Sequence, residues 1–314
     1  MTAEWFMKVG KKLWAVLLAL AMGIFAAGCA GPENELNNLN REPAKPAKEL
    51  TIGDIGWDEG VAVSNLTKAL LEDELDYDSV ELKTLDVAPL FERVGNGELD
   101  AFQDVWLPNH QRYLSGVQDD VELLDPWYSG TTRVGIAVPS YMNITSIPQL
   151  NLTTTEEIGG IKEEAAISKR ISDVVIPTYA LKQEYSSWDA PAALLFEVDK
   201  RIRNGETFAF IAWSPHWMNQ RYDLVYLDDP QDALGELNEP SSITTAVRKQ
   251  LPNDEPVAYA FMKALTLTEE QVNDLEGAIN AAGNPLSGAR TWAKNNRDVV
   301  QPWIDTAKQA QHES

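Results

Sequence analysis

Segments with the periodicity of strands alternate with segments that have the periodicity of helices, and this alternation confines the chain to a layered α/β fold. Residues 49–56 alternate apolar and polar side chains, as a half-buried strand does. Residues 61–75 instead place Val63, Leu66 and Leu70 at helical spacing. The order strand, helix, strand, helix, strand predicts a parallel sheet with right-handed crossovers. The elements expected in this part are strands at 49–56, 80–85 and 101–105 and helices at 61–75 and 88–94.

The same kind of pattern restarts after residue 131, which indicates a second α/β unit. A chain of 314 residues is long enough for two such units of ordinary size. Thr268 and Gln271 have the spacing of a capping box, so a helix is expected to begin there. The elements expected here are strands at 132–138, 208–213 and 224–227, a helix start within 158–171, and helices at 190–204, 256–265, 268–282 and 285–306.

Three tryptophans, Trp57, Trp106 and Trp213, stand where a predicted strand ends. A single tryptophan at such a position ordinarily caps a hydrophobic core. Ligands of open parallel sheets, however, bind beyond the carboxyl ends of the strands. Because both units carry tryptophan at that edge, we expect the three indoles to face one cleft between the units.

A cluster of indoles suits a cation that carries no N–H group. A trimethylammonium group cannot donate hydrogen bonds, but the quadrupole of an indole ring attracts it, with about 2 kcal/mol or more for a desolvated contact. Asp58 and Glu59, which follow Trp57, add carboxylates that could assist at the positive end of the ligand. The strand ends therefore predict a site for a quaternary-ammonium compound.

The N-terminal segment has the composition of an export signal. Lysines precede an apolar run from 13 to 27, which is shorter than the roughly 20 residues of a membrane-spanning helix. Ala26-Ala27-Gly28-Cys29 resembles a bacterial lipobox, which implies removal of residues 1–28 and a lipid anchor on Cys29. A plain secretory signal or an uncleaved anchor would equally place the body outside the cytoplasm. Residues 29–48 are expected to form a flexible tether.

Composition excludes several classes of function. The formal charge is −22, so the chain repels nucleic acid and anionic membrane surfaces, which require a basic face. One cysteine cannot form a disulfide framework, and three histidines without paired spacing do not predict a metal site. The sequence has no Gly-x-Ser-x-Gly turn and no glycine-rich phosphate loop, so we expect neither a cofactor nor catalysis.

Four motifs together resemble a known family, the glycine betaine, choline and carnitine-binding proteins of osmoprotectant ABC importers. Any one motif would be weak evidence, but the set is specific, and the resemblance covers about residues 49–306. It implies an α/β fold of the two-domain, type II periplasmic-binding-protein class, with the ligand cleft between the lobes. The motifs are Gly-Trp-Asp-Glu-Gly (56–60), Asp-Val-Trp-Leu-Pro-Asn-His (104–110), Ala-Val-Pro-Ser-Tyr (137–141) and Trp-Ser-Pro-His-Trp (213–217).

The resemblance also implies roles for single residues. Tryptophans that match Trp57, Trp106 and Trp213 form the cage around the ammonium in this family, and a fourth aromatic residue of some members is matched here by Tyr128. A histidine that donates to a ligand carboxylate is matched by His110, which stands one residue earlier than in many relatives.

Further donors for a carboxylate are expected from backbone N–H groups at a helix start, because such a terminus favours anions. The resemblance maps this start onto Ala166 and Ile167. Glu163 and Glu164 stand just before it, where relatives have uncharged residues. Two carboxylates beside the anion site make choline, or another ligand without a carboxylate, more plausible.

The family further implies a hinged protein that closes on its ligand and then docks on a membrane permease driven by an ATPase. The expected lobes are 49–131 with 240–311, and 132–239, with hinge crossings near 129–134 and 236–245. We expect a monomer that works outside the cytoplasm, as a lipoprotein on the outer face of the cytoplasmic membrane or in the periplasm.

Two alternatives stay open. A protein of the same fold could bind an amino acid or a polyamine, although a polyamine needs acidic groups around its N–H donors. A lipid-anchored hydrolase such as a glycosidase would require two carboxylates about 5–9.5 Å apart in the cleft.

Overall fold

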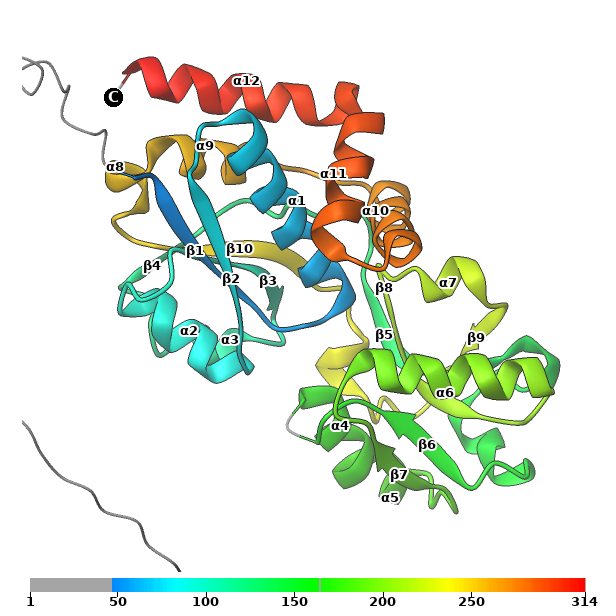
Figure 1. The fold of residues 1–314 in the computed structure, drawn as a ribbon. Coiled ribbons are helices and arrows are strands. Elements are labelled where there is room, and N and C mark those ends of the chain that lie inside the picture. Colours follow the sequence, from blue (N-terminus) through cyan, green and yellow to red (C-terminus); the bar gives the residue numbers. More distant parts are fainter. Residues whose placement is uncertain (1–46, 164, 314) are drawn as a thin grey trace, which may run out of the picture. The chain divides into compact units, whose positions relative to one another are not determined.

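The strands of the computed structural model form two sheets of the same design (Figure 1). The structure describes residues 47–163 and 165–313. The strand order is β2-β1-β3-β10-β4 in the first sheet and β7-β6-β8-β5-β9 in the second. The strands are β1 (Glu49–Asp54), β2 (Ser79–Thr84), β3 (Ala101–Leu107), β4 (Val121–Leu123), β5 (Arg133–Pro139), β6 (Glu157–Gly160), β7 (Glu184–Ser187), β8 (Ala209–Ser214), β9 (Leu224–Tyr226) and β10 (Ser242–Arg248).

Helices connect the strands and cover the sheets. The α-helices are α1 (Asp58–Glu74), α2 (Val87–Gly95), α3 (Gln111–Leu114), α4 (Ala166–Arg170), α5 (Ile176–Thr178), α6 (Pro191–Asn204), α7 (Met218–Arg221), α8 (Leu251–Asp254), α9 (Pro256–Ala264), α10 (Glu269–Ala282), α11 (Pro285–Asn295) and α12 (Arg297–Glu313). The other helical segments are η2 (Ser140–Met142), η3 (Ile147–Leu152), η4 (Ile171–Val175) and η5 (Gly235–Asn238).

The two sheets repeat one arrangement of strands. β1 pairs in parallel with β2 and β3, while β10 runs antiparallel to β3 and β4. In the second sheet β6 pairs in parallel with β7 and β8, while β5 runs antiparallel to β8 and β9. β1 therefore corresponds to β6, and β3 to β8. The predicted parallel sheet is right for β1 to β3 and wrong for the whole sheet, because β10 returns to it in the opposite direction.

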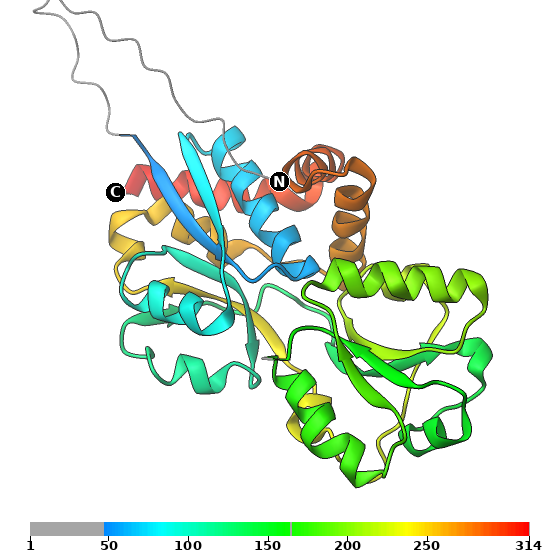
Figure 2. The ribbon, with the colours of Figure 1, turned by 60° about the horizontal axis from the view of Figure 1, so that its bottom comes forward.

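Each sheet has helices on both faces. We call the first sheet with α1–α3 and α8–α12 lobe I, and the second sheet with the helical segments between β5 and β10 lobe II. From β1 to β2 the chain moves outward in the sheet, and from β2 to β3 it moves back, so right-handed crossovers bring α1 and α2 to opposite faces (Figure 2). The core of lobe I is accordingly divided, with Leu66 and Leu70 of α1 in one hydrophobic cluster and Leu90 and Phe91 of α2 in another.

The chain crosses between the lobes twice, from β4 to β5 and from β9 to β10. The two crossings are bonded to each other, because the hydroxyl of Thr132 donates to the carbonyl of Ser241 at 3.0 Å. Residues from 47 onwards form one compact unit. The lobe boundaries after residues 131 and 239 stay a prediction.

Two predicted segments differ from the structure. The expected helix at 285–306 is two helices, α11 and α12, because Asn296 leaves the helical region with φ −117° and ψ 46°. The helix start expected within 158–171 is preceded by a strand, β6. Within the described residues, no helix combines the length and the apolar character needed to cross a membrane. Cys29 and the predicted signal segment lie outside the described residues.

Candidate ligand-binding site

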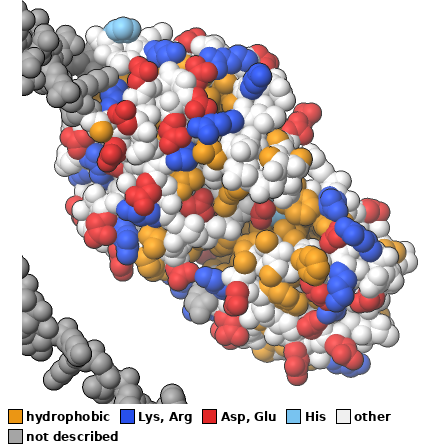
Figure 3. Space-filling model, in the orientation of Figure 1, with side chains coloured by type: hydrophobic (Ala, Val, Ile, Leu, Met, Phe, Trp, Pro, Cys, Tyr) orange, Lys and Arg blue, Asp and Glu red, His pale blue; other side chains and the backbone are white. Residues whose placement is uncertain are grey.

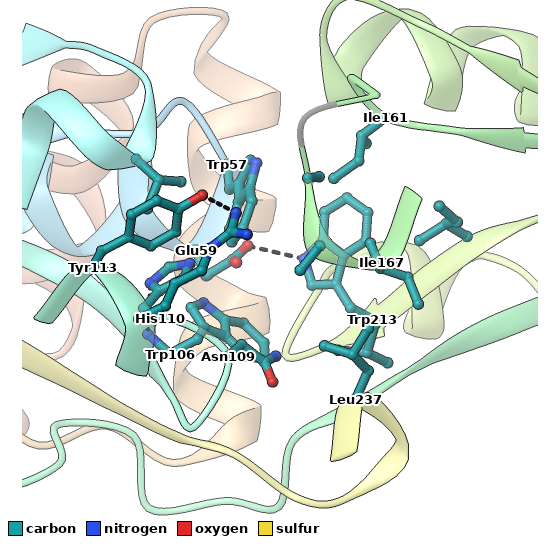
Figure 4. A pocket seen from close by; sticks show the side chains of 16 residues that line it. Trp57, Glu59, Trp106, Asn109, His110, Tyr113, Ile161, Ile167, Trp213 and Leu237 are labelled. Carbon is teal, nitrogen blue, oxygen red and sulfur yellow. Dashed lines mark hydrogen bonds between the residues drawn. The ribbon is translucent and has the colours of Figure 1, made fainter. Parts of the chain in front are cut away.

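A pocket lies between the lobes, where the carboxyl ends of β1 and β3 meet those of β6 and β8 (Figure 4). It encloses about 670 Å³ of space between protein atoms, part of it open to solvent. On the face seen in Figure 3, apolar side chains gather where the lobes meet, and charged side chains are spread over both lobes. The lining residues are Trp57, Glu59, Val87, Trp106, Asn109, His110, Arg112 and Tyr113 of lobe I, and Val134, Ile161, Ala165, Ala166, Ile167, Ile211, Trp213 and Leu237 of lobe II.

The structure brings the three predicted tryptophans together in this pocket. Trp57 follows a turn at Gly56, whose φ of +83° lies in the left-handed region that favours glycine. Its ring meets that of Trp106 edge to face, with centroids 6.4 Å apart and an angle of 77°. Trp213 approaches from lobe II because β8 is the counterpart of β3. The carboxyl ends of two equivalent strands, β3 and β8, therefore supply one indole from each lobe.

Buried carboxyl groups fix two of the indoles from behind. The indole N–H of Trp106 donates to Oδ1 of Asp104 at 2.7 Å, and that of Trp213 donates to Oε2 of Glu59 at 3.0 Å. Both tryptophans are 5% exposed or less. Because a carboxyl group satisfies the polar edge of each ring, the ring faces are available to line the pocket.

These carboxyl groups belong to a buried acidic cluster formed by Glu59, Asp104 and Glu276. Burial, together with the negative charges of Asp104 and Glu276, raises the pKa of Glu59 well above its usual value. Burial raises the pKa of Asp104 to about 8, although the bond from Trp106 opposes the shift. Burial and the charge of Asp58 also raise the pKa of Glu276. Near neutral pH the cluster therefore holds protons.

Glu59 is the member of this cluster that faces the pocket. It is fully buried, and its Oε1 has no hydrogen-bond partner among the described residues. The first turn of α1 can carry it close to β3 because Gly60 has no side chain. A Cβ at Gly60 would lie 2.8 Å from Oδ2 of Asp104.

His110 lies against the cage as a neutral ring. Burial, followed by the charge of Arg112, lowers its pKa to about 3. Its Nδ1 accepts the backbone N–H of Trp106 at 3.2 Å, so the proton of the neutral ring is assigned to Nε2. His110 therefore offers a ligand an N–H donor rather than a positive charge.

Asp58 does not line the pocket, which corrects its predicted place at the positive end of a ligand. Its side chain instead pairs across the lobes with Nε2 of His216 at 3.1 Å and accepts the indole N–H of Trp217 at 3.3 Å. Burial alone would raise the pKa of Asp58, but the hydrogen bonds and the charge of His216 lower it below its usual value. Asp58 therefore joins the lobes.

Tyr128 is also absent from the lining, which corrects its predicted place in the cage. It is 4% exposed and packs beside Trp127, with its ring folded over Gly130. The fourth aromatic residue of the pocket is Tyr113, which stacks on Phe91 with centroids 6.0 Å apart. The sequence contained a signal for Tyr113, because a residue three positions after His110 lies on the same face of a helix.

The predicted anion contacts Ala166 and Ile167 line the pocket at the start of α4. Glu163 is exposed and does not line it, and Glu164 lies outside the described residues. Glu163 therefore gives no reason to expect choline rather than glycine betaine in this pocket. Within residues 47–163 and 165–313, no group of His, Cys, Asp and Glu side chains is arranged to hold a metal ion.

Comparison with known proteins gives a consistent result. A family model described as the substrate binding domain of ABC-type glycine betaine transport systems matches residues 48–295. The glycine betaine/carnitine transport binding protein GbuC of Listeria monocytogenes serotype 1/2a (strain 10403S) is 31% identical over 157 residues. This match covers 50% of each protein, so it spans about half the length of that relative.

Solved structures agree in fold. Lactococcal OpuAC, in a closed conformation complexed with glycine betaine, is 29% identical with a TM-score of 0.71, covering 82% of this chain and 99% of that one. The glycine betaine and L-proline-binding protein ProX of Borrelia burgdorferi is 24% identical with a TM-score of 0.72, covering 84% and 99%. A choline-binding protein in complex with choline is 20% identical with a TM-score of 0.71, covering 83% and 96%. The type II periplasmic-binding-protein fold is thus established.

Proposed function

The chain belongs to the family of substrate-binding domains of ABC-type glycine betaine transport systems, and on this basis we propose that it captures a quaternary-ammonium solute, such as glycine betaine, for delivery to a membrane permease. Family members are substrate-binding proteins of transport systems and work outside the cytoplasm. A lipid anchor at Cys29, and action as a monomer, are parts of the same proposal.

The observation that carries the proposal is the meeting of Trp57, Trp106 and Trp213 in one pocket. A quaternary ammonium offers methyl groups and a diffuse charge, so indole faces hold it better than hydrogen-bond acceptors do. Trp213 comes from lobe II and the other two come from lobe I, so a cation between them is contacted from both sides. Such a ligand favours the closed arrangement over an open one, which is the differential affinity that closure requires.

The same lining supports this function over the alternatives. Glu59 is the one carboxylate among the described lining residues. A polyamine would require several acceptors around its N–H groups, and a glycosidase mechanism uses two carboxyl groups in the cleft. One carboxyl beside three indoles instead suits a single methylated cation.

Calorimetry with the purified protein tests the proposal. Glycine betaine is expected to bind at micromolar concentration, and L-arginine and spermidine are expected to show no binding at a hundredfold higher concentration. Choline and carnitine define the breadth of the site. Binding of spermidine or arginine without binding of any methylated ammonium would refute the proposed ligand class.

We further expect the affinity for a methylated cation to rise with pH. A fixed positive charge near Glu59 favours its carboxylate form, so binding releases part of a proton from a group whose pKa is raised in the free protein. By linkage, the association constant should be up to about tenfold larger at pH 8 than at pH 6. Calorimetry in buffers of different ionisation enthalpy would measure the released proton.

A Glu59→Gln variant keeps the size and the acceptor for Trp213 but cannot ionise, so its affinity should be nearly constant over this pH range. Glu163→Gln is the control, because it removes an exposed carboxylate outside the lining. An unchanged pH dependence in Glu59→Gln would show that another group is responsible.

A further inference from the structure

Arg112 is the one cationic side chain among the described residues that line the pocket. It lies in α3, just after the loop that follows Trp106, and it is exposed. It also borders a neighbouring surface groove that Lys169 and Arg170 line from lobe II. Arg112 therefore stands where the pocket opens to solvent.

Among the described residues, an aromatic ring and not a carboxylate holds the guanidinium of Arg112 in place. Nη2 donates to the phenol oxygen of Tyr113, and the guanidinium carbon lies 4.4 Å from the centre of the same ring. This bond is the dashed line beside Tyr113 in Figure 4. Among the described residues no carboxylate lies within ion-pair distance of it. Seven of the nine other described arginines pair with Asp or Glu, whereas Arg133 lies over the ring of Tyr226 and Arg170 donates to the carbonyl of Ala233.

Acidic side chains are abundant in this chain, with 48 Asp and Glu against 26 Lys and Arg, yet Arg112 has no carboxylate partner among the described residues. A guanidinium has five N–H donors in a planar fork that matches a carboxylate. One donor of Arg112 is used by Tyr113. No described residue accepts a hydrogen bond from the remaining donors, so they can meet an anionic group that reaches the mouth of the pocket.

The inner and outer ends of the pocket therefore carry different polar groups. Glu59, fully buried, stands at the inner end with one oxygen that bonds to no described residue, whereas Arg112 is exposed at the outer end. The indoles of Trp57, Trp106 and Trp213 lie in the same pocket. A ligand with a methylated ammonium among the indoles and a carboxylate at the outer end complements this arrangement, because Arg112 carries the charge of the lining near neutral pH while Glu59 holds a proton. Choline complements only the inner part and carries a net charge that Arg112 repels.

We propose that Arg112, steadied by Tyr113, anchors the carboxylate of a zwitterionic quaternary-ammonium ligand and thereby makes the pocket select betaines over choline. This inference rests on the proposed function and adds the specificity of the same site. His110 supports it as a neighbouring neutral N–H donor in the lining. Arg112 supplies the charge that His110 lacks.

The test compares glycine betaine and choline by calorimetry on the wild type, Arg112→Met and Arg112→Lys. Arg112→Met should weaken glycine betaine about 10- to 30-fold, the effect of losing a hydrogen-bonded charge, and should leave choline unchanged or slightly stronger. Arg112→Lys keeps the charge without the fork and should fall between wild type and Arg112→Met for betaine.

Lys169→Met is the matched control, because it removes the same charge from the neighbouring groove but does not line the pocket. It should change both affinities by less than about twofold, as expected for a screened surface charge. Thermal melts of each variant establish that the fold is retained.

The possible outcomes distinguish a failure of the role proposed for Arg112 from a failure of the proposed function. A wild type that binds glycine betaine, with an Arg112→Met variant that keeps the same ratio of betaine to choline affinity, overturns the role of Arg112 and leaves the proposed function intact. Equal losses for both ligands overturn it as well, because they indicate a general effect on the site. A wild type that binds no methylated ammonium, carnitine included, defeats the proposed function and this inference together.

Discussion

A Trp213→Ala variant is expected to bind glycine betaine about a hundredfold more weakly than the wild type, a loss of about 3 kcal/mol. The variant loses an indole face that meets the cation in a desolvated site, which alone accounts for about 2 kcal/mol. It also loses apolar contact area and leaves a buried oxygen of Glu59 without its donor, since Trp213 donates to that carboxyl at 3.0 Å. Calorimetry at neutral pH measures the effect.

Trp213 should matter more than either tryptophan of lobe I because it also connects the lobes. Its hydrogen bond to Glu59 links β8 to α1, so a ligand that contacts its ring stabilises a contact across the cleft. A Trp213→Phe variant keeps an aromatic face but has no N–H. Its loss of affinity should be about tenfold, intermediate between wild type and Trp213→Ala.

Trp188→Ala is the control for the loss of an indole from lobe II. Trp188 is half-buried, packs against Phe208 with centroids 6.2 Å apart, and does not line the pocket. Its removal should lower thermal stability and leave the affinity of the folded protein close to that of the wild type. Similar losses of affinity in both alanine variants would contradict a direct contact between Trp213 and the ligand.

The three tryptophans could be placed from the sequence because their positions follow from chain topology. A residue at the carboxyl end of a strand reaches the ligand edge of a parallel sheet whatever its neighbours are. Trp106 and Trp213 are the last residues but one of β3 and β8, and these strands hold equivalent places in the two sheets. The periodicity of the strands was therefore sufficient, and no side-chain detail was required.

Tyr128 and Asp58 were misplaced because their side-chain directions depend on contacts between distant segments. Tyr128 lies beside Leu267, to which its backbone is bridged, and no local pattern reveals that pairing. Asp58 is adjacent to Glu59, but in a helix adjacent side chains point about 100° apart. One therefore faces His216 and the other the pocket. Sequence spacing could not decide which.

Arg112 was missed for a different reason. A charged residue in a short helix after a strand is ordinarily a solvated surface residue, and its sequence neighbours give no sign of an unpaired guanidinium. That property depends on the absence of a carboxylate partner, which is decided by the positions of all surrounding acidic side chains. β10 was missed in a similar way, since its residues complete a sheet begun almost 200 residues earlier.

The buried acidic cluster leads to the second large effect, on stability. Folded Glu276 keeps its proton to a higher pH than the unfolded chain does, because burial raises its pKa above the usual 4.5. Asp104 behaves alike, from 3.8 to about 8. Between the unfolded and the folded pKa the native state binds more protons, so the free energy of unfolding falls as pH rises. The protein should therefore be more stable near pH 5 than near pH 8.

A Glu276→Gln variant removes one titratable group and with it the contribution of that group to the pH dependence of the free energy of unfolding. At pH 8 it should be more stable than the wild type by about 2 kcal/mol. The wild type must either bury a charge with poor partners or bind a proton at a cost in free energy, and glutamine requires neither. For a protein of this size that corresponds to a rise of roughly 4–8 °C in the melting temperature. At pH 5, where the carboxyl is neutral in the native state, the difference should nearly vanish. Calorimetric melts at the two pH values give both numbers.

The control must separate this local effect from the general repulsion of a chain with a charge of −22, which also grows with pH. Glu270→Gln removes one charge from the exposed side of the same helix, α10, and should raise the melting temperature at pH 8 by less than about 2 °C. Glu276 also accepts the backbone N–H of Trp217 at 2.6 Å, a bond that the oxygen of glutamine can retain. If Glu276→Gln proves less stable than the wild type at both pH values, the carboxyl is ionised and stabilising in the native state, and the cluster cannot be the protonated support of the cage.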